Sequence, residues 1–261
     1  MNPGVVTLSA TLGATAAIMF ALWLLSLRLR DVSIVDIYWG PGFAVIAAVA
    51  WYLNDPGTAR SAVVPVLAAL WGLRLGVYLG WRNRGKPEDY RYAAMRRRHG
   101  ERFALISLVQ VFGLQAALMW IVSLPLQAVQ FAGVTRPFAL LDWLGVALFA
   151  TGFAFESIGD YQLARFKADP ANRGVVMDRG LWAWTRHPNY FGDFTVWWGF
   201  ASLALAAGAW WTIIGPVVMS VLLLRVSGVA LLERGLRKTK PAYADYAART
   251  SAFFPMPPRR R

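Results

Sequence analysis

Seven long blocks of apolar residues follow one another along the chain, separated by shorter polar segments. Each block holds close to the roughly 20 residues that an α-helix needs to cross a hydrocarbon core of about 30 Å. The pattern therefore predicts an all-α integral membrane protein with seven transmembrane helices. The predicted helices are Val5–Leu27, Ile34–Leu53, Ser61–Trp81, Phe103–Pro125, Phe138–Gly159, Tyr190–Gly208 and Ala209–Leu232.

Polar residues interrupt two of these blocks. Ile34–Leu53 contains Asp36 and a Gly-Pro-Gly sequence, and Tyr190–Gly208 contains Asp193 near its start. The first block is too long for a cleavable signal peptide, and no basic segment precedes it. We therefore expect a single membrane domain over residues 1–261, with four helices in 1–125 and three helices plus a tail in 138–258.

The composition narrows the class of protein further. Hydrophobic residues make up 57% of the 261 residues and charged residues 16%, whereas soluble domains average about 45–50% and about 25%. Disordered, collagen-like and ordinary soluble α/β proteins are excluded. The chain has no cysteine and two histidines, which excludes disulfides, zinc–thiolate sites and cysteine nucleophiles. No metal site is expected.

The distribution of basic residues predicts the orientation. The net charge is +13, and 23 of the 27 lysines and arginines follow the first, third, fifth and seventh helices. Basic loops mark the cytoplasmic side, so the N-terminus is expected outside and the C-terminus inside. Because no soluble basic domain is present, we expect a lipid bilayer and no nucleic acid as partner.

Two long loops on the predicted cytoplasmic side, 82–102 and 160–189, are rich in arginine, asparagine, aspartate and aromatic residues. Together with the tail 233–261 they are expected to cap the helices and to form a cationic vestibule. Arginine binds phosphate with paired hydrogen-bond donors, so such a vestibule suits a phosphate-bearing ligand.

The third predicted helix carries two distinct faces. Glycines 72, 76 and 80 form a small-residue stripe that permits close contact with another helix. Trp71, Arg74 and Tyr78 share a different face, and charged residues within a membrane span are functional candidates. Alternatively, Arg74 extends to the membrane surface or pairs with Asp36, and Tyr78 is an interfacial aromatic.

The fifth helix ends in a charged ladder. Glu156, Asp160 and Lys167 are spaced to lie on one helical face over three turns. Their carboxylates are suited to accept hydrogen bonds from amide or hydroxyl groups of a ligand. The alternative is a salt-bridge ladder at a helix end.

A dense polar motif runs from Asp178 to Asp193. Pro188 is favoured in the first turn of a helix, so the sixth helix is expected to begin there. Arg186, His187, Asn189 and Tyr190 then cluster at the positive end of a helix dipole, where anions bind, and Asp193 follows one turn later. A merely polar helix entry is the alternative.

Several of these motifs resemble a known superfamily. Gly180-Leu181-Trp182 and the run Arg186-His187-Pro188-Asn189-Tyr190-Phe191-Gly192 are similar to the C-terminal signature of steroid 5α-reductases, sterol reductases and isoprenylcysteine methyltransferases. Asn83-Arg84-Gly85-Lys86-Pro87, Asp160-Tyr161 and the tail from Tyr243 to Pro255 resemble the bacterial branch of the steroid 5α-reductase family most.

The resemblance implies a seven-helix membrane enzyme that binds NADPH from the cytoplasm and reduces a carbon–carbon double bond conjugated to a ketone. It implies a substrate side in residues 1–125 and a cofactor-binding half in 138–258. It places these residues at the cofactor: Asn83, Lys86, Glu156, Asp160, Leu163, Lys167, Asn189 and Tyr190. Arg74 in the third helix, and Arg186 and His187 at the positive end of the sixth helix, are further candidates for cofactor binding.

The chemistry requires an acid near the ketone, since charge develops on its oxygen. Asp193 falls where the reductases carry a catalytic glutamate, and Asp36 lies near their Gln-Glu pair, which this chain lacks. The family's catalytic tyrosine falls on or near Trp71, with Tyr78 two turns away. Asp193, Asp36 and Tyr78 are thus the predicted catalytic residues. No Gly-x-Gly-x-x-Gly turn is present, which excludes a Rossmann site.

Three functions remain open at this point. The first is an NADPH-dependent enone reductase of the bacterial inner membrane, open to the cytoplasm, that acts on a steroid-like apolar lipid without an obligate protein partner. The second is an S-adenosylmethionine-dependent methyltransferase, although that branch usually has a Glu-Glu pair where this chain has Glu233-Arg234. The third is a non-catalytic lipid or sterol binder.

Overall fold

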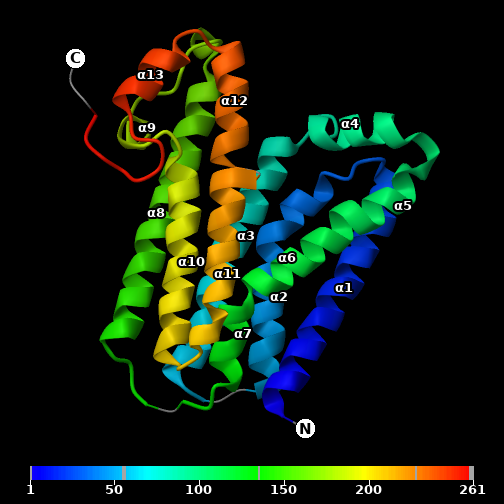
Figure 1. The fold of residues 1–261 in the computed structure, drawn as a ribbon, viewed down its shortest axis with the longest axis vertical. Coiled ribbons are helices and arrows are strands. Elements are labelled where there is room, and N and C mark those ends of the chain that lie inside the picture. Colours follow the sequence, from blue (N-terminus) through cyan, green and yellow to red (C-terminus); the bar gives the residue numbers. More distant parts are fainter. Residues whose placement is uncertain (1, 55–56, 135, 227, 259–261) are drawn as a thin grey trace. The chain divides into compact units, whose positions relative to one another are not determined.

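The structure is a computed structural model that describes residues 2–54, 57–134, 136–226 and 228–258, so the last three arginines of the basic tail lie outside the described residues. Within these ranges the chain is helical, without a β-strand (Figure 1). The α-helices are α1 (Pro3–Leu29), α2 (Ile34–Asn54), α3 (Ala59–Asn83), α4 (Tyr90–His99), α5 (Phe103–Ser107), α6 (Leu114–Val122), α7 (Leu124–Phe131), α8 (Leu140–Ala168), α9 (Leu181–Trp184), α10 (Pro188–Ala206), α11 (Ile214–Val221), α12 (Val229–Thr239) and α13 (Tyr243–Arg249).

Short segments of other helical types join some of these helices. The 3₁₀ segments are η1 (Gly100–Arg102), η3 (Pro170–Asn172) and η4 (Trp210–Ile213), and the π-helical segments are η2 (Leu108–Gly113) and η5 (Leu222–Val226). As a result, Tyr90–Val122 runs as one helical stretch of varying geometry.

Five helical stretches among the described residues are long and apolar enough to cross a membrane: α1, α2, α3, Tyr90–Val122 and α8. They correspond to the first five predicted spans. The apolar helix Trp210–Val226 is shorter, and α10 is not among the five, in keeping with the polar residues in its first two turns. The all-helical prediction is confirmed, whereas seven spans remain a prediction.

The chain forms two compact units. Unit 1 comprises residues 1–139 and 203–215, and unit 2 comprises residues 140–202 and 216–261. Unit 1 therefore contains α1 to α7, and unit 2 contains α8, α9, most of α10, and α12 and α13.

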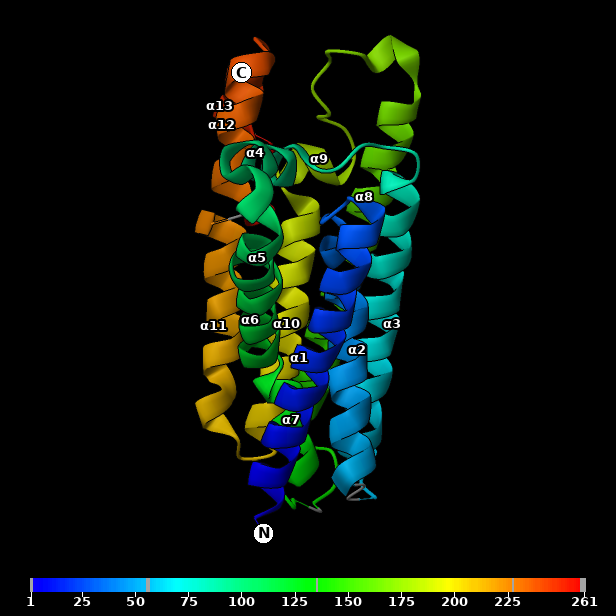
Figure 2. The same cartoon turned by 90° about the vertical axis from the view of Figure 1, so that its right-hand side faces the viewer.

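In unit 1 the close contact of α2 with α3 depends on glycine. Figure 2 shows the two helices side by side. A Cβ atom at Gly72 would lie 2.3 Å from the carbonyl oxygen of Gly40, and one at Gly76 would lie 2.6 Å from the ring of Pro41. The predicted stripe at residues 72, 76 and 80 is thus confirmed as a contact surface, at which small residues let two backbones approach.

The predicted loop 82–102 contains a helix that the hydrophobic pattern did not indicate. Asp89 caps α4, because its carboxylate accepts a hydrogen bond from the N–H of Arg91. The helix ends at His99, and its C-cap is Gly100, whose φ of +52° favours glycine. This helix carries arginines that the sequence analysis assigned to the basic side and to a cationic vestibule.

Buried polar side chains join α1 to α6 and α7 in unit 1. The side chain of Gln127 is fully buried, accepts a hydrogen bond from Thr11 Oγ1 at 2.5 Å and donates to Ser123 Oγ at 2.8 Å. Trp120 Nε1 donates to Thr11 Oγ1 at 3.2 Å. Such bonds satisfy polar groups in a site that is closed to water.

In unit 2, α8 and α10 meet along glycines spaced seven residues apart. A Cβ at Gly152 would lie 2.5 Å from the oxygen of Gly192, and one at Gly192 would lie 2.4 Å from the amide nitrogen of Glu156. A Cβ at Gly199 would likewise lie 2.8 Å from the oxygen of Gly145. The two helices therefore touch backbone to backbone, which fixes the α8 side chains against the start of α10.

Candidate functional site

The predicted ladder of charged residues on α8 becomes more exposed to solvent towards the C-terminal end of the helix. Glu156 and Asp160 are each 4% exposed, Leu163 is half-buried, and Lys167 is exposed in the last turn. A buried carboxylate is costly unless it is neutral, paired or hydrogen-bonded. The α8 face thus presents acceptors in the interior of unit 2 and a cation at its rim.

Asn189 connects this ladder to α10. The helix begins at Pro188, as predicted, and Asn189 Nδ2 donates a hydrogen bond to Asp160 Oδ1 at 3.1 Å. The approach is possible because Gly159 has no side chain: a Cβ there would lie 3.2 Å from the amide nitrogen of Asn189. Two of the predicted cofactor residues, 29 positions apart, are therefore in direct contact.

Asp193 lies one turn further along α10 and is 9% exposed. Tyr190, on the same turn as Asn189, stacks its ring on His187 with centroids 5.8 Å apart. Five predicted site residues thus lie around the first turns of α10: Asp160, His187, Asn189, Tyr190 and Asp193. Their roles in binding or catalysis remain predictions.

Arg186 and His187 both contact one carboxylate, that of Glu233 on α12. Arg186 Nε donates to Glu233 Oε1 at 2.8 Å, and His187 Nε2 lies 3.3 Å from the same oxygen. Arg186 Nη1 also donates to the carbonyl oxygens of Ala247 and Thr250 at 2.7 and 3.2 Å. The guanidinium therefore holds the C-terminal segment in place, a role that the sequence analysis did not assign to it.

Glu233 is strongly biased towards its ionised form. Its hydrogen bond with His187 and the charge of Arg186 outweigh the effect of burial and lower the pKa of Glu233 to about 2. Burial, together with the charge of Glu233, raises the pKa of the Tyr243 phenol to about 12. At neutral pH the cluster therefore contains an ionised carboxylate and a neutral phenol.

The C-terminal segment folds back over α9 and the start of α10. Thr185 and Ser251 form an isolated β-bridge, and Thr185 Oγ1 donates to the carbonyl of Phe253 at 2.8 Å. Tyr246 Oη donates to the carbonyl of Trp182, whose indole donates to the carbonyl of Gly159. The tail is thus part of the wall around the Arg186-His187 motif.

A second cluster forms in unit 1 around Asp36 at the start of α2. Tyr92 Oη donates to Asp36 Oδ1 at 2.8 Å, and Arg91 Nη2 donates to Asp36 Oδ2 at 2.9 Å. Gln115 Nε2 donates to Tyr92 Oη at 3.3 Å. The guanidinium that binds Asp36 is thus that of Arg91, whereas the sequence analysis had considered Arg74 for this position. The hydroxyl proton of Tyr92 is thus directed to Asp36, whereas the guanidinium of Arg91 carries further N–H donors.

The segment before α4 is fixed by its own carboxylates. Glu88 accepts hydrogen bonds from the N–H of Val32 at 2.9 Å and from Arg96 at 2.7 Å. Burial opposes ionisation of Glu88, but these hydrogen bonds outweigh it and keep its pKa below the usual range. Arg91 is held by Asp89 as well as Asp36. The position of Arg91 and Tyr92 is therefore set by the residues on both sides of them.

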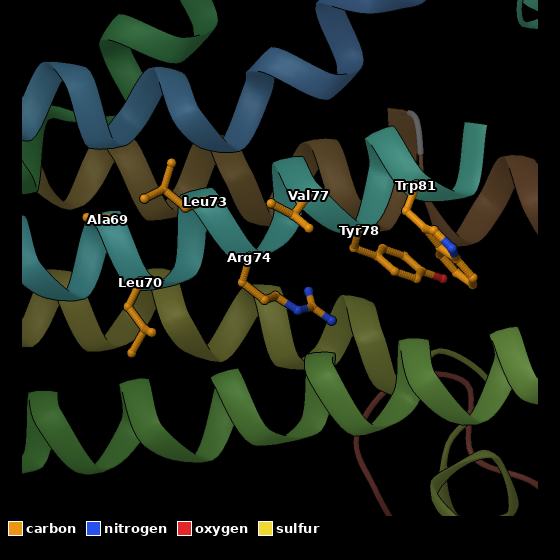
Figure 3. Close-up of a pocket in the computed structure, with 7 residues that line it drawn as sticks. All are labelled: Ala69, Leu70, Leu73, Arg74, Val77, Tyr78 and Trp81. Carbon is orange, nitrogen blue, oxygen red and sulfur yellow. The ribbon is translucent and has the colours of Figure 1, made fainter. Parts of the chain in front are cut away.

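Arg74 and Tyr78 line a cavity of about 560 Å³ along α3. Figure 3 shows the guanidinium of Arg74 extending towards the ring of Tyr78, and its carbon lies 5.5 Å from the ring centroid. Arg82 approaches the same ring at 5.6 Å. Trp71 is instead fully buried against Phe43. Tyr78 therefore makes cation–π contacts with two arginines.

Asn83 and Lys86 lie in the turn after α3. The N–H of Lys86 donates to the carbonyl of Asn83 at 3.0 Å across Gly85, whose φ is +73°. Lys86 is exposed and Asn83 is half-buried. Across the described ranges, no group of three or more acidic or histidine side chains is arranged to hold a metal ion.

Comparison with known proteins places the chain in a family. The model of the family described as "Protein of unknown function (DUF1295)" matches residues 22–250. The chain belongs to this family. The match spans both units and includes the Asp36 cluster, the α8 ladder and the Arg186-His187 motif.

Two curated proteins illustrate the similarity. The uncharacterized protein C594.04c of Schizosaccharomyces pombe is 25% identical over 90% of this chain and 75% of its own length. A probable O-methyltransferase, ustE of Ustilaginoidea virens, is 39% identical over 64 residues, which are 24% of this chain and 22% of that protein. No solved structure matches the chain.

Sequence reasoning missed three residues that complete these clusters: Arg91, Tyr92 and Glu233. The first two belong to the run Glu88-Asp89-Tyr90-Arg91-Tyr92, in which acidic, basic and aromatic residues alternate. This alternation could have indicated a side-chain cluster, because basic residues alone are enough to set the orientation of a membrane protein and need no carboxylates beside them. Glu233 had been considered only in the comparison with methyltransferases.

Proposed function

We propose that this protein is a membrane oxidoreductase that reduces the carbon–carbon double bond of an enone by hydride transfer from NADPH. The substrate is a small apolar lipid, such as a 3-oxo-Δ4 steroid. The observation that carries the proposal is the Asn189–Asp160 hydrogen bond beside buried Glu156 and Asp193. Family membership adds support, since the family includes steroid 5α-reductase-like proteins.

The donor and acceptor set of unit 2 suits a nicotinamide nucleotide. Buried carboxylates accept hydrogen bonds from a carboxamide and from ribose hydroxyl groups, and the amide of Asn189 adds a donor and an acceptor. Lys167, exposed at the end of the same helical face, offers a charge to a phosphate. When bound, NADPH supplies the hydride that attacks the β-carbon of the enone.

The protein's own contribution is to hold the ketone and to stabilise the charge that develops on its oxygen. In unit 2, Asp193 is the proposed acid, because its carboxyl group is 9% exposed and lies one turn beyond Asn189, where it can donate a hydrogen bond or proton to a bound ketone. In unit 1, the earlier candidates for a proton or hydrogen-bond donor are Tyr78 and Asp36, and Asp36 accepts hydrogen bonds from Tyr92 and Arg91. Such a positioned acid contributes roughly 10²–10⁴-fold in rate.

The finer topology is also a proposal. We infer seven spans, with α10 and the segment 210–226 as the sixth and seventh, the N-terminus outside and the C-terminus in the cytoplasm of a bacterium. The support is the alternation of basic loops along the chain, with α4, the end of α8 and the tail on the basic side.

A binding experiment tests the cofactor assignment. NADPH and NADH are titrated into the purified full chain in mild detergent, and binding is measured by calorimetry. We expect Asp160→Asn and Asn189→Ala to weaken NADPH binding about tenfold or more, or about 1.4 kcal/mol. Lys167→Glu is expected to weaken NADPH more than NADH if Lys167 faces the extra phosphate.

The matched control is Arg173→Glu, which makes the same charge reversal at an exposed site of the following segment. If Asp160→Asn, Asn189→Ala and Lys167→Glu all fold and all bind NADPH with unchanged affinity, the proposed binding site is wrong. Equal losses for NADPH and NADH in Lys167→Glu remove the phosphate role alone.

A second candidate function is an S-adenosylmethionine-dependent methyltransferase of the isoprenylcysteine methyltransferase type. The specific observation that favours it is the 64-residue similarity to a probable O-methyltransferase. Buried carboxylates suit a sulfonium or ammonium cation as well as a nicotinamide nucleotide. Titration with S-adenosylmethionine separates the two functions, because the reductase proposal predicts no saturable binding of it.

A further inference from the structure

Unit 2 contains a cavity of about 390 Å³ at the basic end of α8, which the proposed reaction does not use. Its walls are the last turns of α8 and the segment that follows it. The lining residues are Tyr161, Gln162, Arg165, Phe166, Asp169, Asn172, Met177, Arg179 and Gly180.

Specific hydrogen bonds fold the following segment back against α8. Asn172 Nδ2 donates to the carbonyl of Phe166 at 2.9 Å, and Gln162 Oε1 accepts from the N–H of Leu181 at 3.0 Å. Gly180 has a φ of +59°, and a Cβ there would lie 2.5 Å from Gln162 Nε2. These hydrogen bonds fix the two walls of the cavity to each other at both ends.

The cavity is cationic. Arg165 and Arg179 both line it, and neither forms an ion pair with a carboxylate in the described ranges; the polar contact of the Arg165 guanidinium is Tyr161 Oη at 3.4 Å. Asp169 is the acidic residue of the lining, and its Oδ1 accepts from the N–H of Ala171 at 2.9 Å as the cap of η3. Two guanidinium groups are therefore available to a ligand.

This cavity is separate from the ladder on α8. At about 100° per residue, Arg165 lies about 140° around the helix axis from Asp160. The ladder residues Glu156 and Asp160 are buried, whereas Tyr161 is 62% exposed and Arg165 is exposed. A ligand in the cavity would thus occupy the opposite side of α8 from the proposed cofactor.

The position along α8 points to the membrane surface. α8 is one of the five helices that can span a membrane, and Tyr161 and Arg165 lie in its last, polar turns. Tyrosine and arginine at the end of a span are typical of the headgroup region, and basic pockets there bind anionic headgroups.

We propose that Arg165 and Arg179 form a binding site for a phosphate group at the membrane surface. The source of the phosphate is the headgroup of an anionic phospholipid or free phosphate, and both are recognised by the same paired guanidinium donors. The site is independent of NADPH binding and of the reaction proposed above.

Native mass spectrometry of the full chain tests this proposal. Dioleoylphosphatidylglycerol or dioleoylphosphatidylcholine is added at equal concentration to the protein in detergent, and retained lipid is counted. We expect selective retention of one phosphatidylglycerol by the wild type, reduced about tenfold in Arg165→Gln and in Arg179→Gln. Arg173→Gln, which removes an equal charge from the same segment outside the cavity, is expected to retain the lipid within about twofold.

Inorganic phosphate is titrated in parallel to distinguish the two sources. Phosphate binding that is lost in Arg165→Gln and Arg179→Gln, without selective lipid retention, supports the site and assigns it to free phosphate. Equal retention of both lipids together with no phosphate binding overturns the proposal, as does an equal loss in Arg173→Gln. Near-wild-type melting temperatures of the variants show that they are folded.

Discussion

At the scale of single residues, the structure contains two small clusters in which a carboxylate holds a guanidinium and a ring. In unit 1, Asp36 binds Arg91 and Tyr92, and in unit 2, Glu233 binds Arg186 and His187. Each carboxylate has the donors that an ionised group in a half-buried site requires. These clusters link parts of the chain that are 55 and 47 positions apart.

Glu233 gives a prediction about stability. Replacing it in Glu233→Gln removes the ion pair of Arg186, whose side chain is 10% exposed, so we expect a loss of about 1–3 kcal/mol at pH 7. Arg237→Gln is the matched control, because Arg237 is 64% exposed and lies 3.7 Å from the same carboxylate. It should change stability by about 0.5 kcal/mol or less. Thermal unfolding followed by tryptophan fluorescence measures both.

The difference in stability between the wild type and Glu233→Gln is expected to depend on pH. The folded-state pKa of about 2 lies below the ordinary value of 4.5, so the contribution of Glu233 is present above pH 4.5 and is lost as the pH falls towards 2. The wild type and Glu233→Gln should therefore unfold at increasingly similar temperatures between pH 5 and pH 3. A constant difference across this range contradicts the ionised cluster.

At the scale of elements, glycine residues allow helices such as α8 and α10 to pack with their backbones in contact. In Gly192→Ala the new Cβ would lie 2.4 Å from the backbone nitrogen of Glu156, so α8 and α10 must separate. We expect a loss of about 1–3 kcal/mol, measured as a lower melting temperature. The control is Gly235→Ala on α12, where a Cβ would meet no atom within 4 Å, and which should be neutral or stabilising by about 0.5–1 kcal/mol. Equal melting temperatures of the two variants would be inconsistent with this packing.

The hydrophobic pattern predicted most of the helices because a membrane span is a local property of about 20 residues. The start of α10 was also predictable, since Pro188 marks a first helical turn by its own geometry. α4 was not, because its stabilisation depends on the Asp89 cap and on contacts of Arg91 and Tyr92 with α2. A helix that is stabilised mainly by tertiary contacts of polar residues has no apolar periodicity in its sequence from which it could be predicted.

The same limit applies to the candidate site. Residues within one helix, such as Glu156, Asp160 and Lys167, could be grouped by spacing alone. The partners of Asp36 and Arg186 lie 55 and 47 positions away along the chain, and no local pattern encodes such a distance. Asn189 and Asp160 were both named from the sequence, but their contact depends on Gly159 and Pro188 packing together.

At the scale of the whole molecule, the orientation in the membrane gives a direct prediction. The chain has no cysteine, so a single introduced cysteine is a unique label site. A membrane-impermeant maleimide applied to intact cells should modify Thr58→Cys but not Pro87→Cys or Ala171→Cys, because the latter two lie in basic loops. Labelling after cell lysis controls for reactivity. Modification of Pro87→Cys in intact cells contradicts the orientation.

Hydride transfer to an enone is tested by an isotope experiment. The purified full chain is incubated with NADPH deuterated at C4 of the nicotinamide and with a panel of enones that includes 3-oxo-Δ4 steroids. Mass spectrometry then locates the label. We expect a reduced product that carries deuterium on the former β-carbon, and no reduced product with heat-killed protein. Unreduced, unlabelled enones throughout the panel would contradict it.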